Sequence, residues 1–132
     1  MKKILYLGVT FLAFFCISAF SIISHARKNT LDLSYGDTGI TLRCYINCTN
    51  SYGEGSTDWA QTYKYRNYIK VITYDINQNS LGYKESYSSS KASEKVSTGN
   101  PYLTRTYHAA ADSNGQLLPV NEQRQQAQCR DD

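Results

Sequence analysis

The stretch ITLRCYIN at residues 40–47 alternates apolar and polar side chains without interruption. Its apolar members, Ile40, Leu42, Cys44 and Ile46, recur at every second residue. A period of two places such side chains on one face of an extended chain, which indicates a half-buried β-strand. The polar members would then face solvent, so the hydrophobic core would contact only one face of this strand.

The residues that follow read as further strands separated by turns. The polar and glycine-containing segment 49–56 is predicted to be a loop. Residues 59–76 are too many for one ordinary strand, so we expect two strands divided near Asn67, or one strand bent by a bulge. Residues 77–80 would then turn the chain into a partner strand at 81–90, with Ile76 opposite Leu81 and Tyr74 opposite Tyr83.

A third group of strands completes the pattern. Residues 92–97 and 102–110 flank a turn at Gly99-Asn100-Pro101, and a second turn at 112–115 leads into 116–120. About 6–8 short strands, with a turn signal roughly every 8–12 residues, predict an all-β fold, a small antiparallel β-sandwich. We place this domain at residues 39–120. An N-terminal extension at 27–38 precedes it, and a C-terminal tail at 121–132 forms a short helix or is held only by Cys129.

Tyrosine is the dominant aromatic residue of this domain. The chain has 12 tyrosines and one tryptophan, and all four phenylalanines lie within the first 20 residues. Aromatic side chains bury roughly 150–250 Å² each. We therefore expect tyrosine rings, together with Trp59, to fill the core that the scarce aliphatic residues leave open.

Residues 1–26 have a different composition. Lys2 and Lys3 precede an uncharged, apolar stretch at 4–23, which ends at Ser24-His25-Ala26. This arrangement predicts a helical signal peptide cleaved after Ala26. The alternative is an uncleaved membrane anchor, because about 20 apolar residues suffice to cross a bilayer. Either outcome places the domain outside the cytoplasm, secreted in the first case and membrane-anchored in the second.

Three cysteines remain after the leader, and export makes them disulfide candidates: Cys44, Cys48 and Cys129. Along one strand Cys44 and Cys48 would be about 13 Å apart. That exceeds the Cα separation of roughly 7 Å that a disulfide allows. We expect Cys129 to bond to this strand, at Cys48 in preference to Cys44, because Cys48 lies nearer the turn-rich segment.

Charge and histidine content limit the chemistry. The net charge of +3 falls to about +1 without Lys2 and Lys3, so we expect no nucleic-acid partner. His108 is the one histidine outside the leader, and we expect it to be partly exposed on a strand. The acidic residues single out no catalytic pair, and the cysteines lack paired metal-ligand spacing. We therefore predict a protein that is not an enzyme and binds no metal or cofactor.

The segment 61–70 interleaves aromatic and basic residues and contains the candidate binding residues Tyr63, Lys64, Arg66 and Lys70. In a strand, Tyr63 and Tyr65 would share the core face with Ile69 and Val71, while the cations point outward. The favoured interpretation is a tyrosine core with a charged exterior. The alternative is a basic strip that binds an acidic surface polymer, with Trp59 either a core anchor or a platform for a sugar ring.

These features favour a small exported, non-enzymatic binding or effector protein. Its most concrete form is a bacteriocin-like or toxin-like protein acting at a cell surface. The alternative is a surface-retained structural or adhesion component anchored by residues 4–23. The expected partner is a cell-surface component or another protein, and membrane contact arises only through the N-terminal segment if it is uncleaved.

Overall fold

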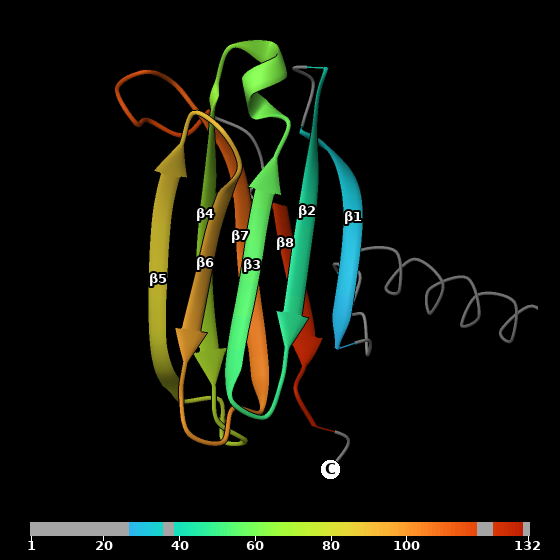
Figure 1. The fold of residues 1–132 in the computed structure, drawn as a ribbon, viewed down its shortest axis with the longest axis vertical. Helices are drawn as coiled ribbons and strands as arrows, with labels where there is room; N and C mark the ends of the chain where they lie inside the picture. Colours follow the sequence, from blue (N-terminus) through green and yellow to red (C-terminus); the bar gives the residue numbers. More distant parts are fainter. Residues whose placement is uncertain (1–26, 36–38, 119–122, 131–132) are drawn as a thin grey trace, which may run out of the picture.

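The computed structural model describes residues 27–35, 39–118 and 123–130. These residues form two antiparallel four-stranded sheets that face one another (Figure 1). The first sheet has the order β1 (Lys28–Tyr35), β2 (Ile40–Cys48), β3 (Tyr52–Asp58), β6 (Ala92–Ser97). The second has the order β5 (Ser80–Ser88), β4 (Arg66–Tyr74), β7 (Leu103–Ala111), β8 (Gln123–Gln128). The predicted all-β, antiparallel class is confirmed, whereas the signal-peptide helix falls outside the described residues.

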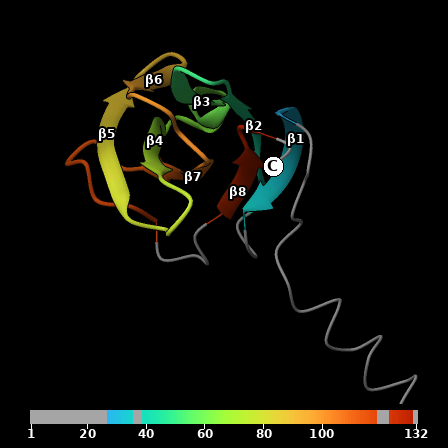
Figure 2. The same ribbon diagram turned by 90° about the horizontal axis from the view of Figure 1, so that it is seen from below.

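Viewed along the strands, the two sheets enclose the core as a flattened ring, with β5 beside β6 at one edge (Figure 2). A short 3-10 helix, η2 (Ala60–Tyr63), connects β3 to β4 at one end of the sheets. The division of the long segment 59–76 therefore lies at this helix, and β4 already includes Asn67.

Both sheets extend beyond the predicted domain of 39–120. Residues of the expected N-terminal extension form β1, which pairs with β2 from Lys28 opposite Asn47 to Tyr35 opposite Ile40. Residues of the expected tail form β8, which pairs with β7 and is neither a helix nor a loose end. The β8 sequence escaped prediction because Ala127 is its only apolar residue, and the inward position beside it is a buried glutamine, Gln125.

The predicted loop at 49–56 is wrong from Tyr52 onward, because β3 begins at that residue. The glycines responsible for the loop prediction permit close packing between the sheets. A Cβ atom on Gly53 would overlap the side chains of Thr104 and Thr73. On Gly55 it would lie 2.5 Å from the Cγ2 methyl group of Thr106. Glycine is therefore required in β3 because the facing strand approaches its backbone so closely.

Two predicted strand partners are also wrong. In the β4–β5 hairpin Tyr74 pairs with Ser80, and Tyr83 pairs with Ile72, because a β-bulge between Thr73 and Tyr74 shifts the register. Ile76 does not face Leu81 and instead lies in the turn that the Asp75–Asn79 backbone hydrogen bond closes. β6 pairs with β3 in the opposite sheet, so the chain crosses between sheets before β7.

The space between the sheets holds small and β-branched side chains. Its largest fully buried aliphatic residues are Leu42, Ile46, Ile69 and Val71. Buried polar side chains lie among them, namely Thr57, Asn67, Thr73, Thr104, Thr106 and His108. The expected tyrosine core is wrong, since Tyr68 is the one buried tyrosine among the described residues. Sheets held this close by Gly53 and Gly55 hold one small ring, that of His108, and the other described tyrosines lie half-buried or exposed.

Candidate functional site

Tyrosines and cations cover the outer face of the β5-β4-β7-β8 sheet. Ile69 and Val71 point inward from β4, so the alternate residues of β4 and their partners on β5, β7 and β8 point outward. We call this surface the tyrosine–cation face. Its aromatic and basic members are Tyr68, Tyr74, Tyr83, Tyr87, Tyr107, Arg66, Lys70, Arg105 and Arg124.

Three of these cations lie over tyrosine rings of a neighbouring strand. The guanidinium of Arg66 is 5.5 Å from the Tyr87 ring centroid. The Lys70 ammonium is 5.2 Å from the Tyr83 ring, and the Arg105 guanidinium is 5.0 Å from that of Tyr74. Such contacts are favourable by roughly 0.5–1 kcal/mol at exposed sites. They also restrain long side chains in extended positions, which reduces the entropy lost when a ligand binds.

One carboxylate, that of Glu85, accompanies these cations among the described residues of the face. It accepts a hydrogen bond of 2.7 Å from the Tyr68 hydroxyl. Arg124 is exposed on β8 and has no ion-pair partner in the described part of the chain. The face therefore has an excess of positive charge.

The outer face of the opposite sheet also carries cations, but its charges are balanced. Arg43 pairs with Asp32 at 3.0 Å, and Lys95 pairs with Glu54 at 3.6 Å. The hydrogen bond from Arg43 lowers the pKa of the Asp32 carboxyl group, as expected for a stabilised carboxylate. The difference between the two faces is one of net charge, because cations also lie over rings on this face, as at Tyr45 and Tyr52.

The sequence-predicted binding residues separate into two groups. Arg66 and Lys70 belong to the tyrosine–cation face. Lys64 follows η2 and precedes β4, and it lines, with Arg66, an open hollow of about 360 Å³. Tyr63 is in η2 and is 39% exposed, so the expectation that it faces the core is wrong. The left-handed backbone of Lys64, with φ of 67°, interrupts the alternation that the prediction extended through this segment.

Trp59 lies apart from the tyrosine–cation face, at the start of η2, where its φ is 80°. It is half-buried, and the Arg43 guanidinium covers its ring at 4.1 Å. Asp58 fixes this turn by accepting hydrogen bonds from the Trp59 backbone and the Gln61 amide. The tryptophan is thus neither enclosed in the core nor an open platform for a sugar ring.

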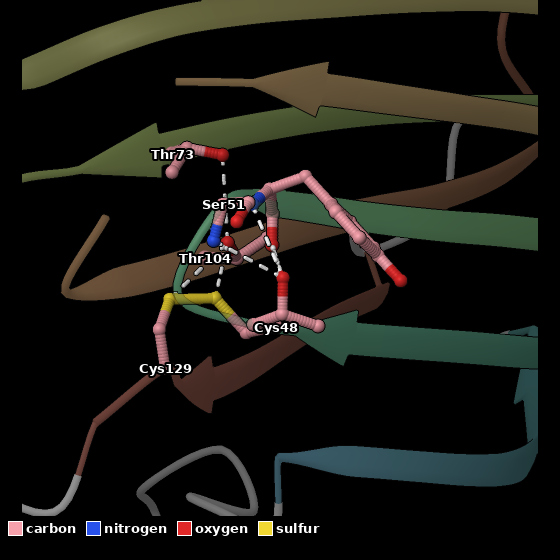
Figure 3. Close-up of a disulfide and its surroundings, with 7 residues drawn as sticks. Cys48, Ser51, Thr73, Thr104 and Cys129 are labelled. Atoms are coloured by element: carbon pink, nitrogen blue, oxygen red, sulfur yellow. Dashed lines mark hydrogen bonds between the residues drawn. A yellow bond between two sulfur atoms is a disulfide. The ribbon is translucent and has the colours of Figure 1, made fainter. Parts of the chain in front are cut away.

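The expected disulfide joins Cys48 to Cys129, with their Cα atoms 4.6 Å apart, and Cys44 is a free, buried cysteine. Figure 3 shows Thr104 beside the two sulfur atoms, with its hydroxyl 2.9 Å from Cys48 Sγ. The bond connects the end of β2 to the residue after β8 and therefore links the two sheets.

His108 is fully buried, which corrects the expectation of a partly exposed residue. Its Nδ1 atom is 2.8 Å from the Thr57 hydroxyl, and its Nε2 atom is 2.8 Å from the Thr106 hydroxyl. Burial lowers the pKa of His108 to about 3, so the ring is neutral at physiological pH. The imidazole serves as a hydrogen-bonded part of the core and does not reach the surface.

Sequence reasoning missed most of the tyrosine–cation face, including Tyr83, Tyr87, Arg105 and Tyr107. The available signal was the alternation of residues 83, 85 and 87 and of residues 103, 105 and 107. It shows which residues share a face of each strand, but it does not show which face is buried, because threonine and alanine fill the inner positions of β7.

Within residues 27–35, 39–118 and 123–130, no group of three or more His, Cys, Asp or Glu side chains is arranged to hold a metal ion. No helix in these ranges has the length and apolar character needed to cross a membrane. No protein-family model, curated protein or solved structure matches the chain.

Proposed function

We propose that this protein is a small exported binding protein that recognises an acidic polymer of a cell surface through its tyrosine–cation face. One observation carries the proposal. Among the described residues, four cations and five tyrosines share one outer face with a single carboxylate, whereas Arg43 and Lys95 on the opposite face each pair with a carboxylate. This difference gives the molecule one side that attracts anions although its net charge is small.

The spacing of the groups suits a repeating ligand. The cations lie on three adjacent strands, and neighbouring strands are about 4.8 Å apart. A flexible polymer with one negative charge per repeat can therefore meet several cations in succession. Tyrosine rings provide flat apolar surface beside hydroxyl groups, a combination suited to the faces and hydroxyls of sugar rings.

The buried position of His108 supports a role without catalysis. General acid–base catalysis requires a proton-transferring group within hydrogen-bond reach of the substrate. His108 already contacts Thr57 and Thr106 between the sheets. The described carboxylate of the tyrosine–cation face is Glu85, which accepts a hydrogen bond from the Tyr68 hydroxyl.

The test measures binding of polygalacturonate, an acidic polysaccharide, with neutral dextran as the reference. Lys70→Gln/Arg105→Gln should weaken polygalacturonate binding about tenfold or more, corresponding to about 1.4 kcal/mol. Arg27→Gln/Lys28→Gln removes the same charge from β1 and its preceding residue and should leave binding within about twofold. Equal losses for both variants would mean that net charge alone, and not this face, determines binding.

A surface-binding protein of this kind becomes an effector if its attachment harms the bound cell. The bacteriocin-like or toxin-like form of the proposal predicts growth inhibition when purified protein is added to sensitive cells. The alternative, a surface-retained structural or adhesion component, requires that the apolar stretch at 4–23 is not cleaved from the domain and anchors it in the membrane. Cell fractionation separates the two, because a shortened band in the medium supports release and a full-length band in membranes supports retention.

A further inference from the structure

A second hollow lies where the edge of the β3–β6 pair meets β5. Its volume is about 450 Å³, within the range of roughly 300–1,000 Å³ typical of small-molecule sites. Its lining includes Tyr45, Glu54, Ser56, Lys84, Lys91 and Ser93. Most of these residues belong to the sheet opposite the tyrosine–cation face, so the hollow is a separate feature of the molecule.

The shape of the hollow follows from small residues in register. Ser56 on β3 lies opposite Ser93 on β6, and the next outward pair along the strands is Glu54 with Lys95. Short side chains between longer ones leave a depression in the sheet surface. Among the described residues, no Ala, Val, Leu or Ile lines this hollow, so an apolar molecule would gain little by entering it. A molecule rich in hydroxyl groups would find hydrogen-bond partners there.

Glu54 is held in a fixed position at one side of the hollow. Its Oε1 atom accepts hydrogen bonds from the Tyr45 hydroxyl at 3.3 Å and the Asn47 amide at 3.0 Å. Lys95 lies 3.6 Å from Oε2. Burial and the Glu54 charge raise the pKa of Tyr45, so its hydroxyl remains a donor at neutral pH. A carboxylate restrained in this way is prepared to accept a ligand hydroxyl without reorganisation.

The other side of the hollow is cationic. Lys84 and Lys91 line it, and neither has an ion-pair or hydrogen-bond partner within the described residues. Lys95 already neutralises Glu54. Glu94 is the remaining carboxylate of the lining. Two unpaired lysines against one glutamate leave a net positive charge where a ligand anion would sit.

We propose that this hollow binds a small anionic saccharide, a sugar unit that carries a carboxylate or a phosphate. Glu54, Ser56 and Ser93 receive the sugar hydroxyls, and Lys84 with Lys91 receives the anionic group. Tyr45 borders the ring. The site goes beyond the proposed function, since it takes a single sugar unit at residues that are not part of the tyrosine–cation face.

The experiment titrates the 15N-labelled exported protein with glucuronate, glucose 6-phosphate and glucose, following backbone amide shifts by NMR. Glucuronate or glucose 6-phosphate should shift the amides of Ser56 and Ser93, and comparison of the two distinguishes carboxylate from phosphate recognition. Glucose, which lacks the anionic group, should bind at least about tenfold more weakly than either anion. Equal binding of glucose, or no shift with either anion up to about 50 mM, would overturn the proposal.

Two variants with opposite expected effects control for structural damage. Lys84→Gln/Lys91→Gln should weaken glucuronate binding about tenfold, whereas Glu94→Gln should tighten it because a like charge is removed. Lys70→Gln/Arg105→Gln should leave the glucuronate-induced shifts of the Ser56 and Ser93 amides unchanged, so failure of the polymer-binding proposal and failure of this one give different results. Unchanged binding in the double lysine variant, or weaker binding in Glu94→Gln, would contradict the assignment.

Discussion

Gly53 on β3 lies directly against Thr104 on β7, so closely that a Cβ atom on the glycine would overlap the threonine hydroxyl. This contact sets the separation of the two sheets next to the Cys48–Cys129 disulfide, which the same hydroxyl contacts. Because the sheets are close here, threonine and alanine fill the interior and the tyrosines lie on the outside. The tyrosine–cation face is thus a consequence of how the core is packed.

Gly53→Ala should destabilise the protein by about 1–3 kcal/mol, because the added methyl group overpacks the interior between β3 and β7. Urea unfolding measures the loss. Gly99→Ala is the matched control, since a Cβ atom there meets nothing within 4 Å, and its stability should change little. The double variant Gly53→Ala/Thr104→Ala should recover part of the loss; a double variant no more stable than Gly53→Ala would argue against this steric explanation.

Removing the disulfide with Cys48→Ala/Cys129→Ala should lower the free energy of unfolding by about 4 kcal/mol in the chain-entropy model, because the two cysteines are 81 residues apart. Cys44→Ala retains the disulfide and should cost less, about 1 kcal/mol. Chemical denaturation of the oxidised proteins provides both values. A smaller loss in the double variant than in Cys44→Ala would contradict a stabilising role for the bond.

Thiol labelling should find Cys44 unreactive in the folded protein. The residue is fully buried, and burial together with the nearby Asp32 charge raises the pKa of its thiol, so little thiolate is exposed to reagent. In denaturant without reductant, a chain cleaved after Ala26 should label once, and a chain that retains its leader should label twice because Cys16 remains. Mass spectrometry reads both numbers, and rapid labelling of the folded chain would place Cys44 at the surface.

Stability should fall as the pH is lowered below about 6.5 because His108 is buried as a neutral ring. The unfolded chain binds a proton at the ordinary histidine pKa, whereas the folded chain does so only near a pKa of about 3. Between these two pKa values, each unit by which the pH falls lowers the free energy of unfolding by about 1.4 kcal/mol. From pH 6.5 to 5 the loss is therefore about 2 kcal/mol, and His108→Gln should flatten this dependence. An unchanged slope in the variant would assign the effect to other groups.

Tyr83 is 61% exposed, so its substitution separates binding from folding. Tyr83→Ala should weaken polygalacturonate binding severalfold, since the ring and its support for Lys70 are lost, while the unfolding free energy changes by less than about 0.5 kcal/mol. Tyr83→Phe keeps the ring and should bind nearly as well as the native protein. Equal weakening by both substitutions would assign the contribution to the hydroxyl group.

Local alternation was sufficient to predict the strand at 40–47, the antiparallel all-β class and the Cys48–Cys129 bond. Alternation at Ile40, Leu42, Cys44 and Ile46 is unambiguous because large apolar side chains occupy one face only. Strand geometry excluded a bond between Cys44 and Cys48, and the nearby turn-rich segment favoured Cys48 as the partner of Cys129. These predictions depended on short-range rules that the rest of the molecule does not alter.

The tyrosine–cation face could not be predicted because it depends on long-range packing. In β7, both faces of the strand carry residues that are buried, half-buried or small, so its sequence does not identify the inward side. That side is decided by Gly53 and Gly55, which lie about 50 residues earlier in the sequence and resemble a loop when read alone. β8 was missed for a related reason, since Gln125 is buried beside His108 only after β7 is in place.

Polymer binding by the tyrosine–cation face is tested most directly by an NMR titration of the 15N-labelled protein with a galacturonate oligomer at low salt. Binding through the tyrosine–cation face should give shifts concentrated at Lys70, Tyr83 and Arg105, on β4, β5 and β7, that diminish as salt screens the charges. Shifts concentrated on β1, β2 and β3, or binding that salt does not affect, would contradict it.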